Sequence, residues 1–237
     1  LVPGIVKVGG EFEYFFVNTI GLPFNTGLVI YLLILITVVL LAIKATTQKD
    51  RTRIVVLYLL SVALLGIPFI GDGYKAFGLG ILLLIGLGVL LMFKDKEGEY
   101  LLRKRFLNTS LLCMLVMMIG YSSYAVIVVR STANTPMDQN SPDNVFALGS
   151  YLNREQYGKT PLLYGPTYAS PVERDDTGAA VMTKASKYVK EVKASPDEPD
   201  RYKEIDDNYN TEYSYPSSTK MLFPRLYDSS AKDKYLR

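Results

Sequence analysis

Four apolar runs in the first 129 residues constrain the fold more than any other feature of the sequence. They cover residues 27–43, 54–70, 77–93 and 108–129. Each run is close to the roughly 20 residues that an α-helix needs to cross a hydrocarbon core about 30 Å thick. Lipid offers no water to the backbone, so each run is expected to be helical. A fully buried soluble helix could share this composition, but four in succession favour a transmembrane domain over residues 26–129.

The polar links between the runs predict the orientation of the helices. Residues 44–53 hold four Lys or Arg and residues 94–105 hold five, whereas residues 71–76 hold one. Short loops rich in Lys and Arg stay in the cytoplasm. We therefore expect a multi-pass protein of the inner (cytoplasmic) membrane. Residues 1–25 are then an external interfacial segment, and residues 130–237 form a small periplasmic α+β region.

Composition excludes several kinds of functional site. The 237 residues include no His and a single Cys, which rules out a disulfide framework and a zinc site of His and Cys. The net charge is 26 − 23 = +3 without a basic stripe, so nucleic acid is not expected as a partner. There is no phosphate-binding glycine loop and no dinucleotide fingerprint. We expect neither a metal nor a cofactor, and we expect Cys113 to be a small buried apolar residue.

The first 25 residues mix aromatic and apolar side chains with a few charges, among them Glu11 and Glu13. This segment is too broken to span a bilayer and is typical of a re-entrant or interfacial element. The two glutamates could form a catalytic carboxylate pair. Residues two apart on a helix do not face each other, however, so both side chains are expected in solvent.

Arg130 is the first charged residue after the fourth apolar run. Its guanidinium could anchor the helix end among the lipid headgroups or bind a phosphate, and the sequence leaves both roles open. A loop is predicted for residues 131–140, followed by a helix that starts at Ser141-Pro142-Asp143 with Ser141 as its cap. Further along, residues 179–193 could be a strand pair or a helix, and residues 201–215 alternate as an exposed hairpin does.

Several segments resemble one family of multi-pass membrane proteins common in Bacteroidota. The most specific is RSTANTPMDQNSPDNVFALGSYLNREQYGKTPLLYG at residues 130–165, and VPGIVK, NTIGLPFNTG and LFPRLY at residues 2–7, 18–27 and 222–227 are also similar. The family, domain of unknown function 2723, is grouped as glycosyltransferase family 117 with enzymes similar to the eukaryotic transmembrane protein O-mannosyltransferases.

The resemblance implies an internal fragment of a membrane glycosyltransferase. Such an enzyme moves a sugar from a lipid-phosphate donor to protein hydroxyls on the periplasmic side. The family's acidic catalytic loop lies near the N-terminus of the full protein and has no counterpart in this sequence. We therefore expect a piece of a longer protein, with transmembrane segments upstream and no catalytic residue of its own. The expected partners are membrane lipids, the lipid-phosphate-linked donor and a protein acceptor.

Position along the chain suggests roles for seven residues under this hypothesis. Arg130 would bind the donor phosphate at the membrane interface. The loop over the site is assigned to Asn134, Asp138 and Asn140, and contacts with the acceptor or the soluble domain are assigned to Asn153, Arg154 and Tyr157. The alternative function is a non-enzymatic polytopic transport or assembly component that anchors a periplasmic binding domain.

Overall fold

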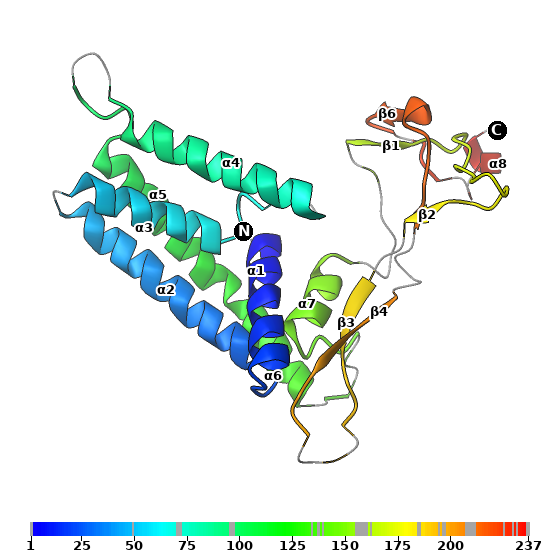
Figure 1. Cartoon of the computed structure of the whole chain (residues 1–237), viewed down its shortest axis with the longest axis horizontal. Coiled ribbons are helices and arrows are strands. Elements are labelled where there is room, and N and C mark those ends of the chain that lie inside the picture. Colours follow the sequence, from blue (N-terminus) through cyan, green and yellow to red (C-terminus); the bar gives the residue numbers. More distant parts are fainter. Residues whose placement is uncertain are drawn as a thin grey trace. The chain divides into compact units, whose positions relative to one another are not determined.

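The chain divides into two compact units in a computed structural model (Figure 1). The first unit comprises residues 1–149 and 190–202, and the second comprises residues 150–189 and 203–237. The structure describes residues 2–48, 50–69, 73–94, 98–133, 135–136, 138, 140–154, 161, 163–183, 186–193, 195, 198–206, 212–224, 226–228, 230 and 232–235.

Helices build the first unit. In chain order they are α1 (Val2–Tyr14), the π-helix η1 (Phe15–Thr19), α2 (Thr26–Thr46), α3 (Arg51–Leu64), α4 (Gly73–Met92), α5 (Lys104–Tyr121), α6 (Ser123–Thr132) and the start of α7 (Val145–Leu152). Three helical stretches in the described residues are long and apolar enough to cross a membrane. They are Thr26–Thr46, Tyr74–Met92 and Lys104–Thr132, the last formed by α5 and α6 together.

The second predicted run differs from the other three. It forms α3, which has 14 residues and at about 1.5 Å per residue is shorter than the hydrocarbon core. The helix ends at Leu64 because Gly66, with φ of 67°, and Pro68 follow directly. The structure thus shows three candidate spans, where the sequence predicted four.

Packing is centred on α2, which contacts α1, α3 and α5, while α4 lies against α3 (Figure 1). One buried cluster joins Tyr31, Leu35 and Val39 of α2 to Leu65. Many other apolar side chains of these helices are exposed, as a lipid environment permits. Cys113 is among the exposed residues, so the expectation that it is buried is wrong. Only the face of α5 that carries Leu107 and Leu111 is buried.

Glycines let α1 approach its neighbours closely. A Cβ on Gly27 of α2 would lie 2.6 Å from the Cα of Glu13 and 2.7 Å from the carbonyl oxygen of Phe12. A Cβ on Gly4 would lie 2.4 Å from the carbonyl oxygen of Leu65. The N-terminal segment is therefore a helix packed backbone to backbone against α2 and the end of α3.

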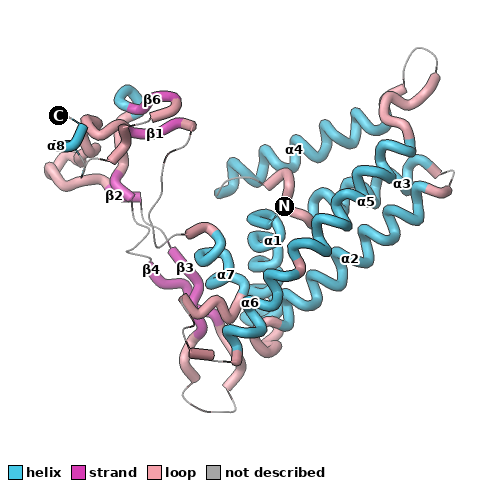
Figure 2. Tube along the Cα trace, turned by 180° about the vertical axis from the view of Figure 1, so that it is seen from behind, coloured by secondary structure: helices cyan, strands magenta, loops and turns pink. Residues whose placement is uncertain are grey.

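Short strands characterise the second unit (Figure 2). β1 (Tyr164–Pro166) pairs antiparallel with β6 (Lys220–Leu222), and β2 (Met182–Thr183) pairs antiparallel with β5 (Glu212–Tyr213). β3 (Ser186–Lys190) pairs with β4 (Tyr202–Asp206), and a short 3-10 helix (Ser217–Thr219) and α8 (Lys232–Tyr235) complete the described elements. Residues 179–193 thus hold strands rather than a helix. The predicted hairpin at 201–215 is wrong, because β4 and β5 each pair with another strand.

The start of α7 also differs from its prediction. Asn144 caps the helix, since its Oδ1 accepts the backbone N–H groups of Phe146 and Ala147, each at 3.0 Å. Ser141 has a positive φ of 38° and lies outside the helix, so its predicted role as the cap is wrong. Asp143 lies just before this cap, where its Oδ1 accepts the Asn144 amide and its Oδ2 pairs with Lys190.

Replacing Gly27 with Ala tests the close approach of α1 and α2. We expect G27A to lower the free energy of unfolding by about 1–3 kcal/mol, because backbone atoms of α1 occupy the place of the new methyl group. The matched control is Gly86→Ala in α4, where no atom lies within 4 Å of the added Cβ and helix propensity favours Ala by up to about 1 kcal/mol. Thermal unfolding in detergent measures both, and equal effects would contradict the packing.

Candidate functional site

A buried carboxylate lies where α1 meets the start of α2. Glu13 is 0 % exposed, so the expectation that it lies in solvent is wrong, whereas Glu11 is exposed as expected. Glu13 Oε1 accepts the backbone N–H of Asn25 at 2.5 Å, and Oε2 accepts that of Leu28 at 2.9 Å. No earlier turn of α2 can accept these N–H groups, and the positive end of the helix dipole favours a carboxylate there. Glu13 therefore acts as the N-terminal cap of α2.

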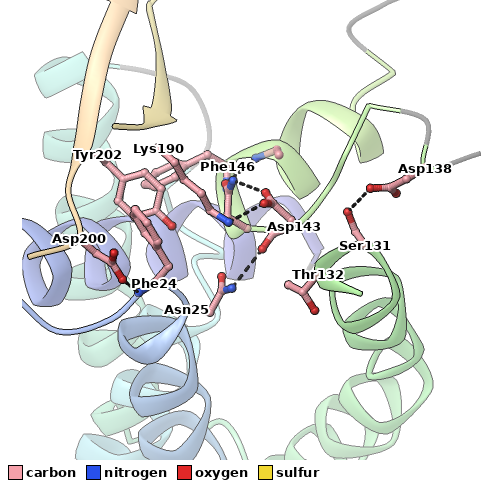
Figure 3. A network of polar contacts seen from close by, with 12 residues as sticks. Phe24, Asn25, Ser131, Thr132, Asp138, Asp143, Phe146, Lys190, Asp200 and Tyr202 are labelled. Atoms are coloured by element: carbon pink, nitrogen blue, oxygen red, sulfur yellow. Dashed lines mark hydrogen bonds and ion pairs between the residues drawn. The ribbon is translucent and has the colours of Figure 1, made fainter. Parts of the chain in front are cut away.

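Tyr202 supplies a third hydrogen bond to the same carboxylate. Its hydroxyl donates to Glu13 Oε1 at 3.0 Å. Its ring packs edge-on against the rings of Phe24 and Phe146, with centroids 4.9 and 5.0 Å away (Figure 3). Burial, and next the negative charge of Glu13, raise the pKa of the Tyr202 phenol. The phenol therefore stays protonated and remains a donor.

The backbone of Tyr202 is held by a side chain of the π-helix η1. Asn18 donates from Nδ2 to the carbonyl oxygen of Tyr202 at 2.8 Å, and its Oδ1 accepts the N–H of Tyr202 at 2.8 Å. One amide thus satisfies both backbone groups of a single residue, as a neighbouring strand would. π-Helical turns are rare and often occur where a side chain has a special task.

Residues 190–202 form the docked segment, which carries two further attachments to the helices. Asp200 Oδ2 accepts the backbone N–H of Phe24 at 2.9 Å, and Asp200 Oδ1 pairs with Lys193 Nζ at 2.7 Å. Burial alone would raise the pKa of Asp200, but these hydrogen bonds and the nearby lysines outweigh it, and the pKa is lowered. The carboxylate is therefore charged at neutral pH.

The second attachment joins the docked segment to the residues before α7. Lys190 Nζ pairs with Asp143 Oδ2 at 2.5 Å and lies 5.1 Å from the centre of the Phe24 ring (Figure 3). The amide Nδ2 of Asn25 donates to the carbonyl oxygen of Asp143 at 3.1 Å. The start of α2, the turn before α7 and the docked segment therefore share one network of polar contacts.

The contacts of this network hold separate segments of the chain together. Glu13, Asp143 and Asp200 are each bound by specific donors, as a carboxylate removed from water requires. Within the described part of the chain, no three His, Cys, Asp or Glu side chains are grouped so that they could hold a metal ion. The network therefore anchors the docked segment to the end of the helical unit.

Two residues singled out by the sequence, Arg130 and Asp138, belong to the end of α6 and to the loop that follows it. Arg130 is exposed in the last turn of the helix, and among the described residues no carboxylate pairs with it. The neighbouring hydroxyl of Ser131 donates to Asp138 Oδ2 at 2.7 Å, which folds the following loop back onto the helix end (Figure 3). Asn140 is exposed in the same loop with φ of 64°.

Of the four remaining predicted residues, the structure describes two. Asn153 and Arg154 are exposed just after α7 and belong to the second unit. Asn134 and Tyr157 lie outside the described residues.

Sequence reasoning missed the network around Glu13. Its contacts join residues as far as 189 positions apart, which no local pattern can indicate. One local signal was present, since Glu13 shares a helix face with Gly9 and Val17, at a spacing of four residues, and both are buried. A glutamate on the buried face of an apolar helix requires donors nearby.

The comparison with known families concerns the C-terminal part of the chain. Residues 158–237 match a model described as "Family of unknown function (DUF8416)". No curated protein and no solved structure matches the chain. The matched range contains the docked segment, which packs with the helical unit, so the family range and the division into compact units do not coincide.

Conservative substitutions test the role of Glu13. We expect Glu13→Gln to cost about 1–3 kcal/mol of unfolding free energy, because a side-chain NH₂ replaces an acceptor and faces a buried backbone N–H. Tyr202→Phe should cost about 1 kcal/mol through the loss of one hydrogen bond. Glu11→Gln, exposed on the same helix, removes the same charge and should leave thermal unfolding in detergent unchanged. A Glu11→Gln effect as large as that of Glu13→Gln would contradict the capping role.

The lowered pKa of Asp200 predicts a pH dependence. A carboxyl whose pKa is lower in the folded state than in the unfolded state stabilises the fold fully at pH values above its unfolded pKa of about 3.9. This stabilisation is lost as the pH falls through its folded pKa. The unfolding temperature should therefore fall more steeply below about pH 4 in the wild type than in Asp200→Asn, which should already be less stable at pH 6. Parallel curves for the two proteins would show that Asp200 is not involved.

Proposed function

We propose that this chain is part of a multi-pass membrane glycosyltransferase, which moves a sugar from a lipid-phosphate donor to protein hydroxyls on the periplasmic side of the inner membrane. Four crossings are part of the proposal, with α3 continued by the turn after Leu64 as the second. The basic links at 44–53 and 94–105 then face the cytoplasm. Residues 1–25 and 130–237 are periplasmic.

Arg130 is the observation that carries this proposal. It lies in the last turn of the 29-residue apolar stretch Lys104–Thr132 and is exposed, without a carboxylate partner among the described residues. A guanidinium at the end of an apolar helix meets the membrane where lipid phosphates begin, and its N–H groups match phosphate oxygens. In this proposal Arg130 binds the phosphate of the sugar donor.

The surrounding residues take supporting roles. Asp138, tied to Ser131, holds the loop beside Arg130, and Asn134 and Asn140 shape the same loop over the donor. Asn153, Arg154 and Tyr157 contact the acceptor or the rest of the soluble domain. The acidic catalytic loop of the resembled family has no counterpart in this sequence, so the proposal assigns catalysis to a part of the enzyme outside this chain.

Replacing Arg130 tests the proposal in the full-length protein. Arg130→Ala should weaken donor binding and lower transfer at limiting donor by about tenfold or more, because a charge-assisted phosphate contact is lost. Arg130→Lys should retain part of the affinity, since it keeps the charge but loses the planar set of donors. Arg105→Ala, exposed at the other end of the same apolar stretch, is the matched control and should not affect either quantity. Binding of a polyprenyl-phosphate sugar and radiolabelled sugar transfer measure the two effects.

Two results would contradict the proposal. One is unchanged donor affinity and transfer in Arg130→Ala. The other is a cytosolic location for a reporter fused after residue 237, because Arg130 would then face the side opposite to the donor site.

A non-enzymatic membrane anchor is the second candidate function. The network around Glu13 favours it, since contacts of Glu13, Asn18, Phe24 and Asp143 hold the docked segment to the helical unit, as a component that presents a periplasmic binding domain would need. The sequence upstream in the same reading frame discriminates the two functions. An acidic residue in the first external loop favours the glycosyltransferase, and its absence favours the anchor.

A further inference from the structure

A second buried charge lies at the other end of the helical unit. Arg51, the first residue of α3, is 6 % exposed. Its Nη2 donates to the carbonyl oxygen of Leu91 at 2.6 Å and to that of Leu102 at 3.0 Å. These bonds join the start of α3 to the end of α4 and to the residues before α5. They account for the structural role of the side chain.

The rest of this guanidinium has no acceptor. Arg51 Nε and Nη1 are buried and make no hydrogen bond within the described part of the chain. A guanidinium has five N–H bonds, of which the two on Nη2 are used, so one on Nε and two on Nη1 are left. Buried donors of a charged group are costly to leave unbonded, which points to an acceptor that is not part of the described chain.

The surroundings of Arg51 favour an anionic acceptor. The Tyr100 ring centre lies 4.5 Å from Arg51 Cζ and 5.0 Å from Lys94 Nζ, so two cations share one ring. Residues 44–53 and 94–105 together contain nine Lys or Arg against four Asp or Glu. The structure describes two of these acids, and both have partners already, since Asp50 caps α3 and Glu99 pairs with Arg103, while Asp95 and Glu97 lie outside the described residues. An anion near Arg51 would offset this excess of positive charge.

Apolar residues beside the guanidinium indicate where the anion comes from. Three apolar side chains near the guanidinium in the chain are exposed. Phe93 follows α4, Leu101 precedes Leu102, and Phe106 lies in the first turn of α5. A soluble phosphate would leave these side chains in water. A lipid would place its phosphate at the cations and its acyl chains against the apolar residues.

We propose that Arg51 and Lys94 bind the phosphate of an anionic lipid headgroup between the start of α3 and the end of α4. A soluble phosphate compound and a lipid headgroup would offer Arg51 the same phosphate oxygens. The exposed apolar residues favour the lipid as the molecule that carries the phosphate. Because Nε and Nη1 are buried, side chains around the guanidinium, the Tyr100 ring among them, must move for the phosphate to reach these atoms. This site is independent of sugar transfer and lies at the opposite end of the apolar helices from Arg130.

Lipid titration of the delipidated full-length protein in detergent tests the site. Phosphatidylglycerol should bind at least about tenfold more tightly than phosphatidylcholine by native mass spectrometry and should raise the unfolding temperature. Arg51→Lys and Arg51→Gln should weaken phosphatidylglycerol binding by about tenfold. Lys94→Gln, at an exposed position that leaves folding intact, should weaken it by about threefold. Arg53→Gln removes the same charge from an exposed position two residues away and is the matched control, with less than about a twofold effect expected.

Several outcomes would overturn the proposal. An Arg53→Gln effect equal to that of the Arg51 variants would mean diffuse attraction rather than a site. Equal binding of the two lipids by the wild type would remove the headgroup preference without any variant. Inorganic phosphate at millimolar concentration that displaces the lipid and stabilises the protein equally would identify a soluble anion instead.

Discussion

The carboxylate of Glu13 at the start of α2 is the interaction on which the first unit depends. An apolar helix that begins away from water leaves N–H groups that only the protein can satisfy, and Glu13 satisfies two of them. One of these oxygens, Oε1, also accepts the Tyr202 hydroxyl, so one side chain both completes α2 and holds the docked segment. Its geometry requires Gly27, because only a residue without a Cβ lets α1 come close enough. At the other end of the helices, Arg51 has the complementary task, since it donates to a carbonyl at the end of α4.

The hydropathy pattern predicted the helices, which depend on neighbouring residues, and missed features that depend on contacts between distant parts of the chain. The runs at 27–43, 77–93 and 108–129 form helices, as expected for continuous apolar stretches long enough to span a bilayer. The run at 54–70 has the same composition, but its helix ends at Leu64, two residues before Gly66. The close contact between Gly66 and Gly4 cannot be predicted from hydropathy. The prediction of strand pairing was wrong for the same reason, because the partners are distant in the sequence. Thr183 pairs with Glu212, and Gly165 with Met221, whereas the alternating pattern of 201–215 suggested pairing within that segment.

The candidate sites show the same division. Arg130 could be singled out because a charge after an apolar run is visible in the sequence, and its exposure in the structure agrees with either role considered for it. Glu13 and Arg51 are buried charges with partners distant in sequence, and nothing in their neighbours along the chain indicates those partners. Glu13 and Arg51 thus lie at the ends of helices, where backbone N–H and carbonyl groups without partners in the helix need hydrogen bonds from side chains.

Residues 190–202 lie inside the range that matches a family of unknown function, yet they pack with the helical unit. A recombinant fragment cut at residue 158 to obtain a soluble domain would therefore separate Tyr202 from Glu13 and Asn18. It would present an aromatic ring and unbonded backbone groups to water, which invites self-association. For crystallisation or antibody production, the helices that complete this segment should be kept with it.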